Sequence, residues 1–416
     1  MSTLWPDKIH RLRDSRTTAL VLVTFATFTD IVAYSVAVPV LPDLSRKLGA
    51  SPTTIGFLFS SFGITLLTVS MPMGAVSDRI GRRSPLVGGF IALAASTTLF
   101  AFGGTLPVLF AARLVQGAAD GITWVVGFAL IADLFGSTER GRVTGIIMSG
   151  ASVAFMVGPS LGGWLYEIGG MRLPFLTVAL LATLGALACL CLRFPSRRAG
   201  REHVPITTLI KVPAVAICTA AVVAASATIS MIEPVLALQL ETSLDVGPAR
   251  VGVIFGVAAV ATAMLHPMFG RMSDRFGARR LTLAGLVLTA GALILLGQTW
   301  SFQSAIWFYT IQAAALALVI TPSLAYMAEA TSDAGIGSFG VAYGLYNMAW
   351  GAGLLGGPAL GGFLFERIGF HMLALAWTPW LVVIAWTLAR VQSSARGPRE
   401  ALAAERERVG VGPREQ

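Results

Sequence analysis

The run GAVSDRIGRR at residues 74–83 decides the fold, because its pattern of glycines and charged residues recurs at residues 270–279 as GRMSDRFGAR. A second pair stands at a similar separation, GPSLGG at 158–163 and GPALGG at 357–362. Two motif pairs with a shared spacing indicate that the chain is a duplicated half. Both pairs adjoin long apolar runs, so the duplicated unit is predicted to be a membrane bundle. Parallel repeats of helical halves are typical of transporters.

The composition excludes a soluble fold. Of the 416 residues, 55% are hydrophobic and 12% are charged, and the mean hydropathy is +0.75. A soluble domain has about 25% charged residues, and a transmembrane helix needs about 20 apolar ones. We predict an all-α integral membrane protein with twelve transmembrane helices in two six-helix repeats. The predicted spans are 17–42, 54–77, 85–102, 107–135, 143–166, 174–193, 213–240, 249–272, 281–300, 305–330, 338–365 and 372–391.

The polar segments divide the chain. Residues 194–212 form the longest internal polar stretch and are predicted to be a cytoplasmic linker. It separates an N-terminal bundle at 17–193 from a C-terminal bundle at 213–391. Residues 1–16 and 392–416 are predicted to be a cytoplasmic N-terminal segment and a cytoplasmic tail.

The basic residues predict the orientation. Most of the 30 Lys and Arg residues fall on one side of the membrane if the amino terminus is cytoplasmic, and the positive-inside rule then places both termini there. This topology explains the net charge of +9 without a nucleic-acid surface, since the basic clusters are short and lack interleaved aromatic residues. Lysine is rare beside arginine, which indicates a GC-rich bacterial genome and a bacterial inner membrane.

The repeated basic run is predicted to act as a cytoplasmic gate. Its glycine ends a helix and permits a tight turn. The acid and the arginines can pair with one another or with the C-terminal ends of neighbouring helices, where cations are favoured. An ordinary positive-inside loop is the alternative, and Asp133 and Glu329 are read as helix-end or gate residues. The predicted gate comprises Gly74, Asp78, Arg79, Arg82, Gly270, Asp274, Arg275 and Arg279.

The basic run and the Gly-Pro motif together resemble the major facilitator superfamily over essentially the whole chain. Gly344 and Gly353 give the second Gly-Pro motif the spacing associated with antiporters of that superfamily, while Ala154 replaces a glycine in the first. Small residues let helices approach closely, and proline bends a helix. A dry hinge that resists ion leakage is one interpretation, and close packing without coupling is the other. The predicted helix-packing motif comprises Gly158, Pro159, Gly162, Gly357, Pro358 and Gly361.

Four charged side chains fall inside the predicted spans. A carboxylate at the centre of a bilayer costs about 2.5–3.5 kcal/mol to insert, so such residues face a cavity or a partner. Asp120 lies two turns after Arg113 on one helix face, which leaves a structural ion pair and a proton relay as alternatives. Residues 113–117, RLVQG, resemble the Arg-bearing motif in the fourth helix of proton-driven members. The predicted proton-coupling residues are Asp30, Arg113, Asp120 and Glu233.

The sequences around Asp30 and Glu233 resemble the first and seventh helices of vesicular monoamine transporters. The resemblance implies that Asp30 pairs with a substrate amine and that Glu233 is a second acid for recognition or proton exchange. Phe62 replaces that family's basic residue in the second helix, and Thr321 and Asn347 stand near its acids in the tenth and eleventh. Aromatic side chains could add cation–π contacts, with simple packing as the alternative. The predicted substrate-binding residues are Asp30, Tyr34, Glu233, Tyr346 and Asn347.

These patterns predict a proton-coupled secondary transporter. We expect an antiporter that exports cationic or amphipathic amine-like compounds, drugs included, by alternating access. It is expected to be a monomer in the bilayer and not an enzyme, without metal or other cofactor, and ATP is not expected to drive it because the chain lacks a GxxxxGK[ST] motif. Two alternatives stay open: a proton-coupled transporter of a neutral metabolite such as a sugar, and a non-transporting membrane sensor.

Overall fold

The computed structural model describes residues 16–192, 212–333 and 339–390, and these form helices joined by short connections. The predicted N-terminal segment, linker and tail therefore lie almost wholly outside the described residues. The helices are α2 (Arg16–Ser35), η1 (Val38–Val40), α3 (Leu41–Leu48), α4 (Pro52–Ile80), α5 (Arg83–Phe102), α6 (Leu106–Leu134), α7 (Ser137–Gly169), α8 (Arg172–Cys191), α10 (Pro213–Leu244), α11 (Pro248–Phe276), α12 (Ala278–Leu296), α13 (Phe302–Asp333) and α14 (Phe339–Arg390).

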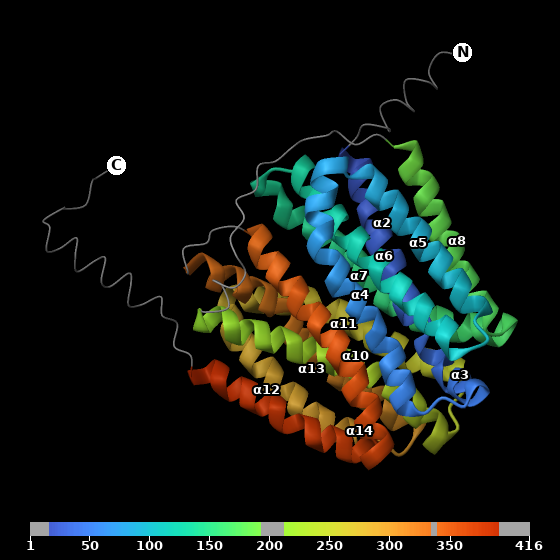
Figure 1. Ribbon diagram of the computed structural model, residues 1–416. Coiled ribbons are helices and arrows are strands. Elements are labelled where there is room, and N and C mark those ends of the chain that lie inside the picture. The colour runs from blue at the N-terminus through green and yellow to red at the C-terminus, as the bar shows by residue number, and fades with distance from the viewer. Residues whose placement is uncertain (1–15, 193–211, 334–338, 391–416) are drawn as a thin grey trace, which may run out of the picture.

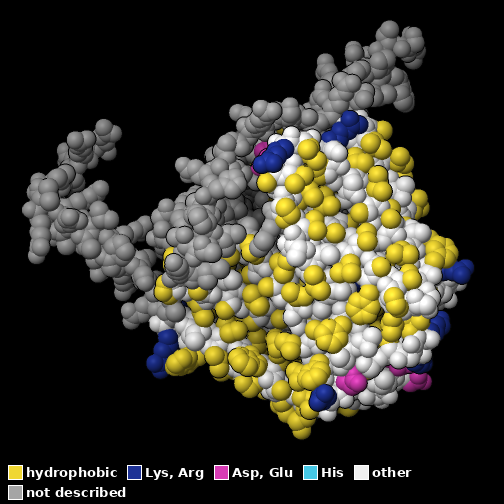
Figure 2. All heavy atoms as spheres, in the orientation of Figure 1, with side chains coloured by type: hydrophobic (Ala, Val, Ile, Leu, Met, Phe, Trp, Pro, Cys, Tyr) yellow, Lys and Arg dark blue, Asp and Glu magenta, His cyan; other side chains and the backbone are white. Residues whose placement is uncertain are grey.

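The described helices provide twelve apolar segments that can span a membrane. Eleven segments are long and apolar enough to span it, and the last of them contains two spans because α14 breaks at Gly369, where φ is 73° and ψ is 172°. Only glycine adopts this backbone conformation readily. Figure 2 shows hydrophobic side chains over the middle of the molecule's face and charged ones toward its periphery. The predicted all-α fold is confirmed.

The first predicted span, 17–42, lies within one candidate membrane span, Arg16–Leu48. Its helix is interrupted, because α2 ends at Ser35 and the chain continues through η1 into the separate helix α3. Pro39 and Pro42 explain the break, because proline removes a backbone donor and clashes with the preceding turn of a helix. Gly49, in the left-handed conformation with φ of 59°, then ends α3.

The helices form two groups that meet along two helix pairs. In Figure 1, α2 and α4–α8 lie at the upper right, α10–α14 lie at the lower left, and α3 is at the lower right. The groups contact each other mainly through α4 with α14 and through α7 with α11. We call the end of the bundle at which α4 and α11 terminate the basic end, and the opposite end the α3 end.

The Gly-Pro motifs pack each group onto its own first helix. A Cβ at Gly162 would overlap the carbonyl oxygen of Val36, which follows α2, and one at Gly357 would overlap that of Ala227 in α10. A Cβ at Gly158, the equivalent of Gly357, would instead overlap the side-chain hydroxyl of Ser35 in α2. The glycines of the two motifs thus allow α7 and α14 to pack directly against the chain at the first helix of each group.

We expect Gly162→Ala and Gly357→Ala to destabilise the protein by about 1–3 kcal/mol, the usual effect of overpacking. The obstacle at each site is backbone, which cannot rotate away. Gly356→Ala is the matched control, because its added methyl group would meet nothing within 4 Å. Thermal unfolding in detergent measures the difference, and equal stability of all three variants would contradict the packing account.

Candidate central binding site

Asp30 of α2 is the most buried acid at membrane depth, with 2% of its surface exposed. The hydroxyl of Thr123 in α6 donates to its Oδ2 atom at 2.5 Å. Its Oδ1 atom is buried and has no hydrogen-bond partner among the described residues. Asp120, one turn before Thr123, lies within electrostatic range of Asp30. The charge of a second acid thus acts on Asp30, and no cation is paired with Asp30 among the described residues.

Arg113 does not neutralise these acids. Its guanidinium lies over the rings of Phe59 at 4.1 Å, Phe100 at 5.1 Å and Tyr34 at 5.5 Å, measured to the ring centroids. Nη1 donates to Gln116 Oε1 at 2.9 Å, whereas Nε and Nη2 have no partner among the described residues. Among the described residues, Arg113 forms no ion pair with Asp120, although their spacing along α6 would allow one. Aromatic faces hold this buried cation instead.

Glu233 supplies the acid of the second group. It lies in α10 directly before Pro234 and is 5% exposed. Within the described residues it forms no hydrogen bond or ion pair. Its charge acts on the hydroxyl groups of Tyr34 in the first group and Tyr309 in the second. Tyr34 therefore contacts Arg113 in its own group and is also influenced by the charge of Glu233 in the second group.

The repeat relates these residues in a way that the sequence analysis missed. Tyr309 and Gln312 stand one repeat after Arg113 and Gln116, with the same offset as the basic runs. Gln312 is 1% exposed, and neither atom of its amide has a partner among the described residues. Glu233 likewise stands one repeat after Tyr34, with the offset of the Gly-Pro motifs. Aligning the two halves would have exposed both pairs.

The other predicted substrate residues, Tyr346 and Asn347, lie on α14 of the second group. The ring of Tyr346 stacks on that of Trp350, with centroids 6.3 Å apart, and its hydroxyl is 3.5 Å from Ser323 Oγ. Asn347 is half-buried on the same helix, α14. No recorded contact joins Tyr346 or Asn347 to Asp30.

The positions that depart from the vesicular pattern have clear packing partners. Phe62 packs against the ring of Tyr34, with centroids 5.2 Å apart. Thr321 Oγ1 lies 2.6 Å from Nδ1 of His266, and this contact joins α13 to α11.

The described residues contain no cluster of three or more His, Cys, Asp or Glu side chains that could hold a metal ion.

The first basic run ties its own group together at the basic end. Arg82 Nε donates to Asp133 Oδ2 at 2.8 Å, its Nη2 pairs with Asp78 Oδ1 at 2.5 Å, and its Nη1 donates to Ser77. Burial lowers the pKa of Arg82, but the hydrogen bond and charge of Asp133 and the charge of Asp78 outweigh it and leave the pKa raised. Arg82 therefore remains a cation that joins α4 to α6.

The second basic run keeps only part of this arrangement. Arg279 donates to the Leu388 carbonyl oxygen at 2.7 Å at the end of α14, as Arg83 donates to the Cys189 carbonyl at the end of α8. Ala278 stands at the position of Arg82, so the described second run lacks the buried arginine. Gly81 and Gly277, with φ of 89° and 91°, end α4 and α11. The other gate residues, among them Gly74, Arg79, Gly270 and Arg275, lie within the last two turns of those helices.

A family model for the Major Facilitator Superfamily matches the chain twice, at residues 23–223 and 215–413. This chain belongs to the Major Facilitator Superfamily. It is a multi-pass membrane transporter and not an enzyme, and the double match agrees with the duplication that the motifs predict.

Curated relatives include amine and acetylcholine transporters. The chain is 28% identical to the rat (Rattus norvegicus) chromaffin granule amine transporter over 340 residues, which is 80% of this chain and 63% of that protein. It is 27% identical to the human (Homo sapiens) synaptic vesicular amine transporter, over 82% of this chain and 66% of that protein. The Drosophila melanogaster vesicular acetylcholine transporter is 26% identical, over 88% and 70%. The resemblance to vesicular monoamine transporters is confirmed.

Solved structures share the fold at low identity. A bacterial homolog of the human lysosomal transporter Spinster, in an inward-facing and occupied conformation, has a TM-score of 0.76 at 16% identity, covering 91% of this chain and 98% of that one. The human organic anion transporter TETRAN has a TM-score of 0.65 at 17% identity, covering 89% and 98%.

We expect Arg82→Gln to destabilise the protein by about 3 kcal/mol, because it leaves the buried Asp133 without its cation. The double variant Arg82→Gln/Asp133→Asn should recover part of this loss, since the two residues are coupled. Asp274→Asn, in the run that has Ala278 in place of the arginine, is the control and should change stability by less than about 0.5 kcal/mol. Thermal unfolding of the purified variants tests this, and an Asp274→Asn loss as large as that of Arg82→Gln would refute it.

Proposed function

We propose that this transporter exchanges protons for cationic or amphipathic amines and exports them, drugs included. The observation that carries the proposal is Asp30, a buried carboxyl group with one oxygen bound to Thr123 and the other without a partner among the described residues. Glu233, buried and likewise without a recorded partner, provides a second acid across the centre of the bundle. The substrate site that we propose comprises these acids with Tyr34, and Tyr346 and Asn347 are proposed to extend it along α14.

The physical basis of the exchange is competition for a buried carboxylate. An unpaired carboxylate in a low-dielectric site is unfavourable, and either a proton or an opposite charge relieves it. A bound ammonium group therefore displaces the proton, and a proton displaces the amine. Arg113 is already held by Gln116 and three aromatic rings, so the acids are free to take the substrate cation or a proton.

The names of the relatives support the substrate class. The chromaffin granule and synaptic vesicular proteins are amine transporters, and the Drosophila protein transports acetylcholine, also an organic cation. We extend this substrate class, organic cations, to the present chain because Asp30 and Glu233 lie in the two segments that resemble vesicular monoamine transporters.

We also propose that the basic end faces the cytoplasm of a bacterium, in accord with the distribution of arginine. The two helix groups would then be the bundles at 17–193 and 213–391. In this orientation the basic runs, Asp78 and Asp274 included, form a cytoplasmic gate.

We expect Asp30→Asn to abolish proton release on addition of an organic cation, because the asparagine has no charge for the amine to balance. Proton release from the purified protein in weak buffer, with tetraphenylphosphonium and with a neutral sugar as ligands, measures the coupling. Asp245→Asn, an exposed carboxylate at the α3 end, is the matched control and should behave like wild type. Unchanged cation affinity in Asp30→Asn, or release driven by the sugar, would favour a neutral substrate instead.

We expect Glu233→Gln to flatten the pH dependence of cation binding. Because protons and cations compete for carboxylates, wild-type affinity should rise with pH, and removing one competing acid should reduce the slope. Tetraphenylphosphonium binding between pH 5 and pH 9 tests this, with Glu139→Gln at the basic end as control. Parallel profiles for wild type and Glu233→Gln would assign the coupling to Asp30 or Asp120.

A further inference from the structure

Two glutamates, one from each repeat, bind helix starts in the opposite helix group at the α3 end. Glu366 of α14 accepts a hydrogen bond at Oε2 from the backbone N–H of Thr53 in α4, at 2.9 Å. Glu167 of α7 accepts one at Oε1 from the backbone N–H of Ala249 in α11, at 3.3 Å. The glutamates stand one repeat apart, with the offset of the Gly-Pro motifs. The two contacts therefore form one repeated device.

Each glutamate meets a group that needs an acceptor. The first N–H groups of a helix have no partner within it, and the helix dipole makes that end favourable for a carboxylate. Helices α4 and α11 both begin with proline, at Pro52 and Pro248, and the bound N–H follows directly. The residue before α11 is Gly247, which has no side chain to cap the helix, so the glutamate of the other group supplies the oxygen.

Two glycines bring the same helix starts into backbone contact with the other group. A Cβ at Gly163 of α7 would overlap the carbonyl oxygen of Pro248, and one at Gly362 of α14 would overlap that of Pro52. These are the last glycines of the two Gly-Pro motifs. Whereas their neighbours Gly162 and Gly361 face helices of their own group, these two face across the interface.

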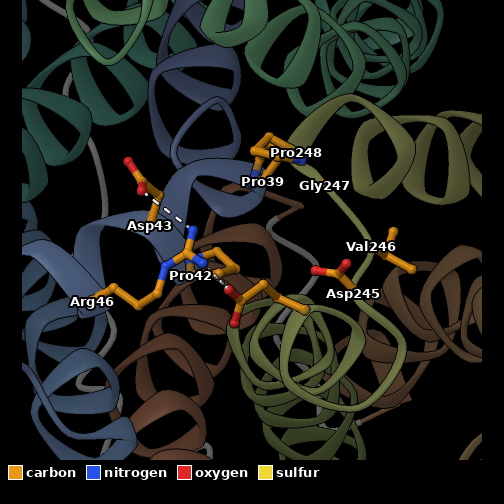
Figure 3. A pocket seen from close by; sticks show the side chains of 9 residues that line it. Pro39, Pro42, Asp43, Arg46, Asp245, Val246, Gly247 and Pro248 are labelled. Atoms are coloured by element: carbon orange, nitrogen blue, oxygen red, sulfur yellow. Dashed lines mark hydrogen bonds and ion pairs between the residues drawn. The ribbon is translucent and has the colours of Figure 1, made fainter.

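A third contact at this end links α3 to α10. Arg46 Nη1 pairs with Glu241 Oε1 at 2.6 Å, and its Nη2 lies 3.4 Å from Asp43. Figure 3 shows the Arg46 side chain near Asp43, in a cavity that Glu241 and Pro248 also line. At the α3 end the two groups are thus joined by an ion pair, by the two glutamate hydrogen bonds and by backbone contacts.

We propose that Glu167 and Glu366 are paired latches that hold the α3 end closed and set the equilibrium with a state in which that end is open. A carrier must expose its site to both sides in turn, and opening the α3 end separates α7 from α11 and α4 from α14. Both latches then break together, and each acts through a helix start, so the two glutamates are positioning residues. The proposal requires only that the chain is a transporter and does not depend on its substrate or on proton coupling.

Spin-label distances in the full chain, reconstituted in nanodiscs, test the latches. With the exposed Cys191 replaced by serine, Phe102→Cys and Met372→Cys report on the α3 end, while Ile80→Cys and Phe276→Cys report on the basic end. Each of Glu167→Gln and Glu366→Gln should raise the ratio of long to short distances at the α3 end about two- to fivefold, as expected for a charge at a helix start. The double variant should multiply the two effects.

The spin-label distance at the basic end, measured in the same variants, distinguishes a latch from a merely structural contact. Release of a latch should shorten the distance at the basic end as the α3 end opens, whereas local loosening would broaden the α3 distances alone. Gly163→Ala and Gly362→Ala should shift the populations in the same direction, because the methyl group displaces the opposite helix start, and Gly145→Ala, which meets nothing within 4 Å, should not. Unchanged populations in the double glutamate variant, or an equal shift in Glu139→Gln, would overturn the proposal.

Discussion

A polar group left without a partner in hydrocarbon is the constraint on which this structure depends. It forces the backbone into helices, since only helices and closed barrels satisfy their own hydrogen bonds in lipid. It confines charged side chains to helix ends, where Arg82, Arg83 and Arg279 bind carboxylates or terminal carbonyl oxygens. The few charged side chains that remain at membrane depth therefore indicate where a functional site lies. Arg113 has an aromatic cage, whereas Asp30 has one oxygen left over for a proton or a ligand.

Duplication followed by divergence gives the centre of the bundle its asymmetry. The repeat places a tyrosine at position 34 of the first half and Glu233 at the matching position of the second. It likewise matches Arg113 with Tyr309, while Gln116 and Gln312 remain the same. The symmetric scaffold thus holds Arg113 beside Tyr34 in the first half and Glu233 in the second, while Asp30 and Asp120 add two acids to the first half. At these two pairs of equivalent positions, the halves differ in charge by a single residue.

The two ends of the bundle use their charges differently. At the basic end, Arg82 joins α4 to α6 within one helix group, so it stabilises a unit that moves as a whole. At the α3 end, Glu167, Glu366 and the Arg46–Glu241 pair join the two groups to each other. Contacts of the second kind are exposed and individually weak, which suits an interface that has to open. Because Arg82 holds its own group together while these charged contacts can break one by one, the arrangement favours rigid-body motion of one half against the other.

The sequence by itself determined the membrane class, the duplication, the twelve spans and the buried acids, because apolar run length and repeated motifs are local properties of the chain. It also predicted that the Gly-Pro motif packs helices, without showing that Gly162 faces α2 while Gly163 faces the other half. Only the tertiary structure decided which groups pair. Spacing along α6 allowed Arg113 to bind Asp120, but the guanidinium turns toward Phe59, Phe100 and Tyr34, which come from other helices. Thr123 beside Asp30, and the reach of Glu366 to Thr53, depend on contacts between segments far apart in the chain, and no local pattern encodes such contacts.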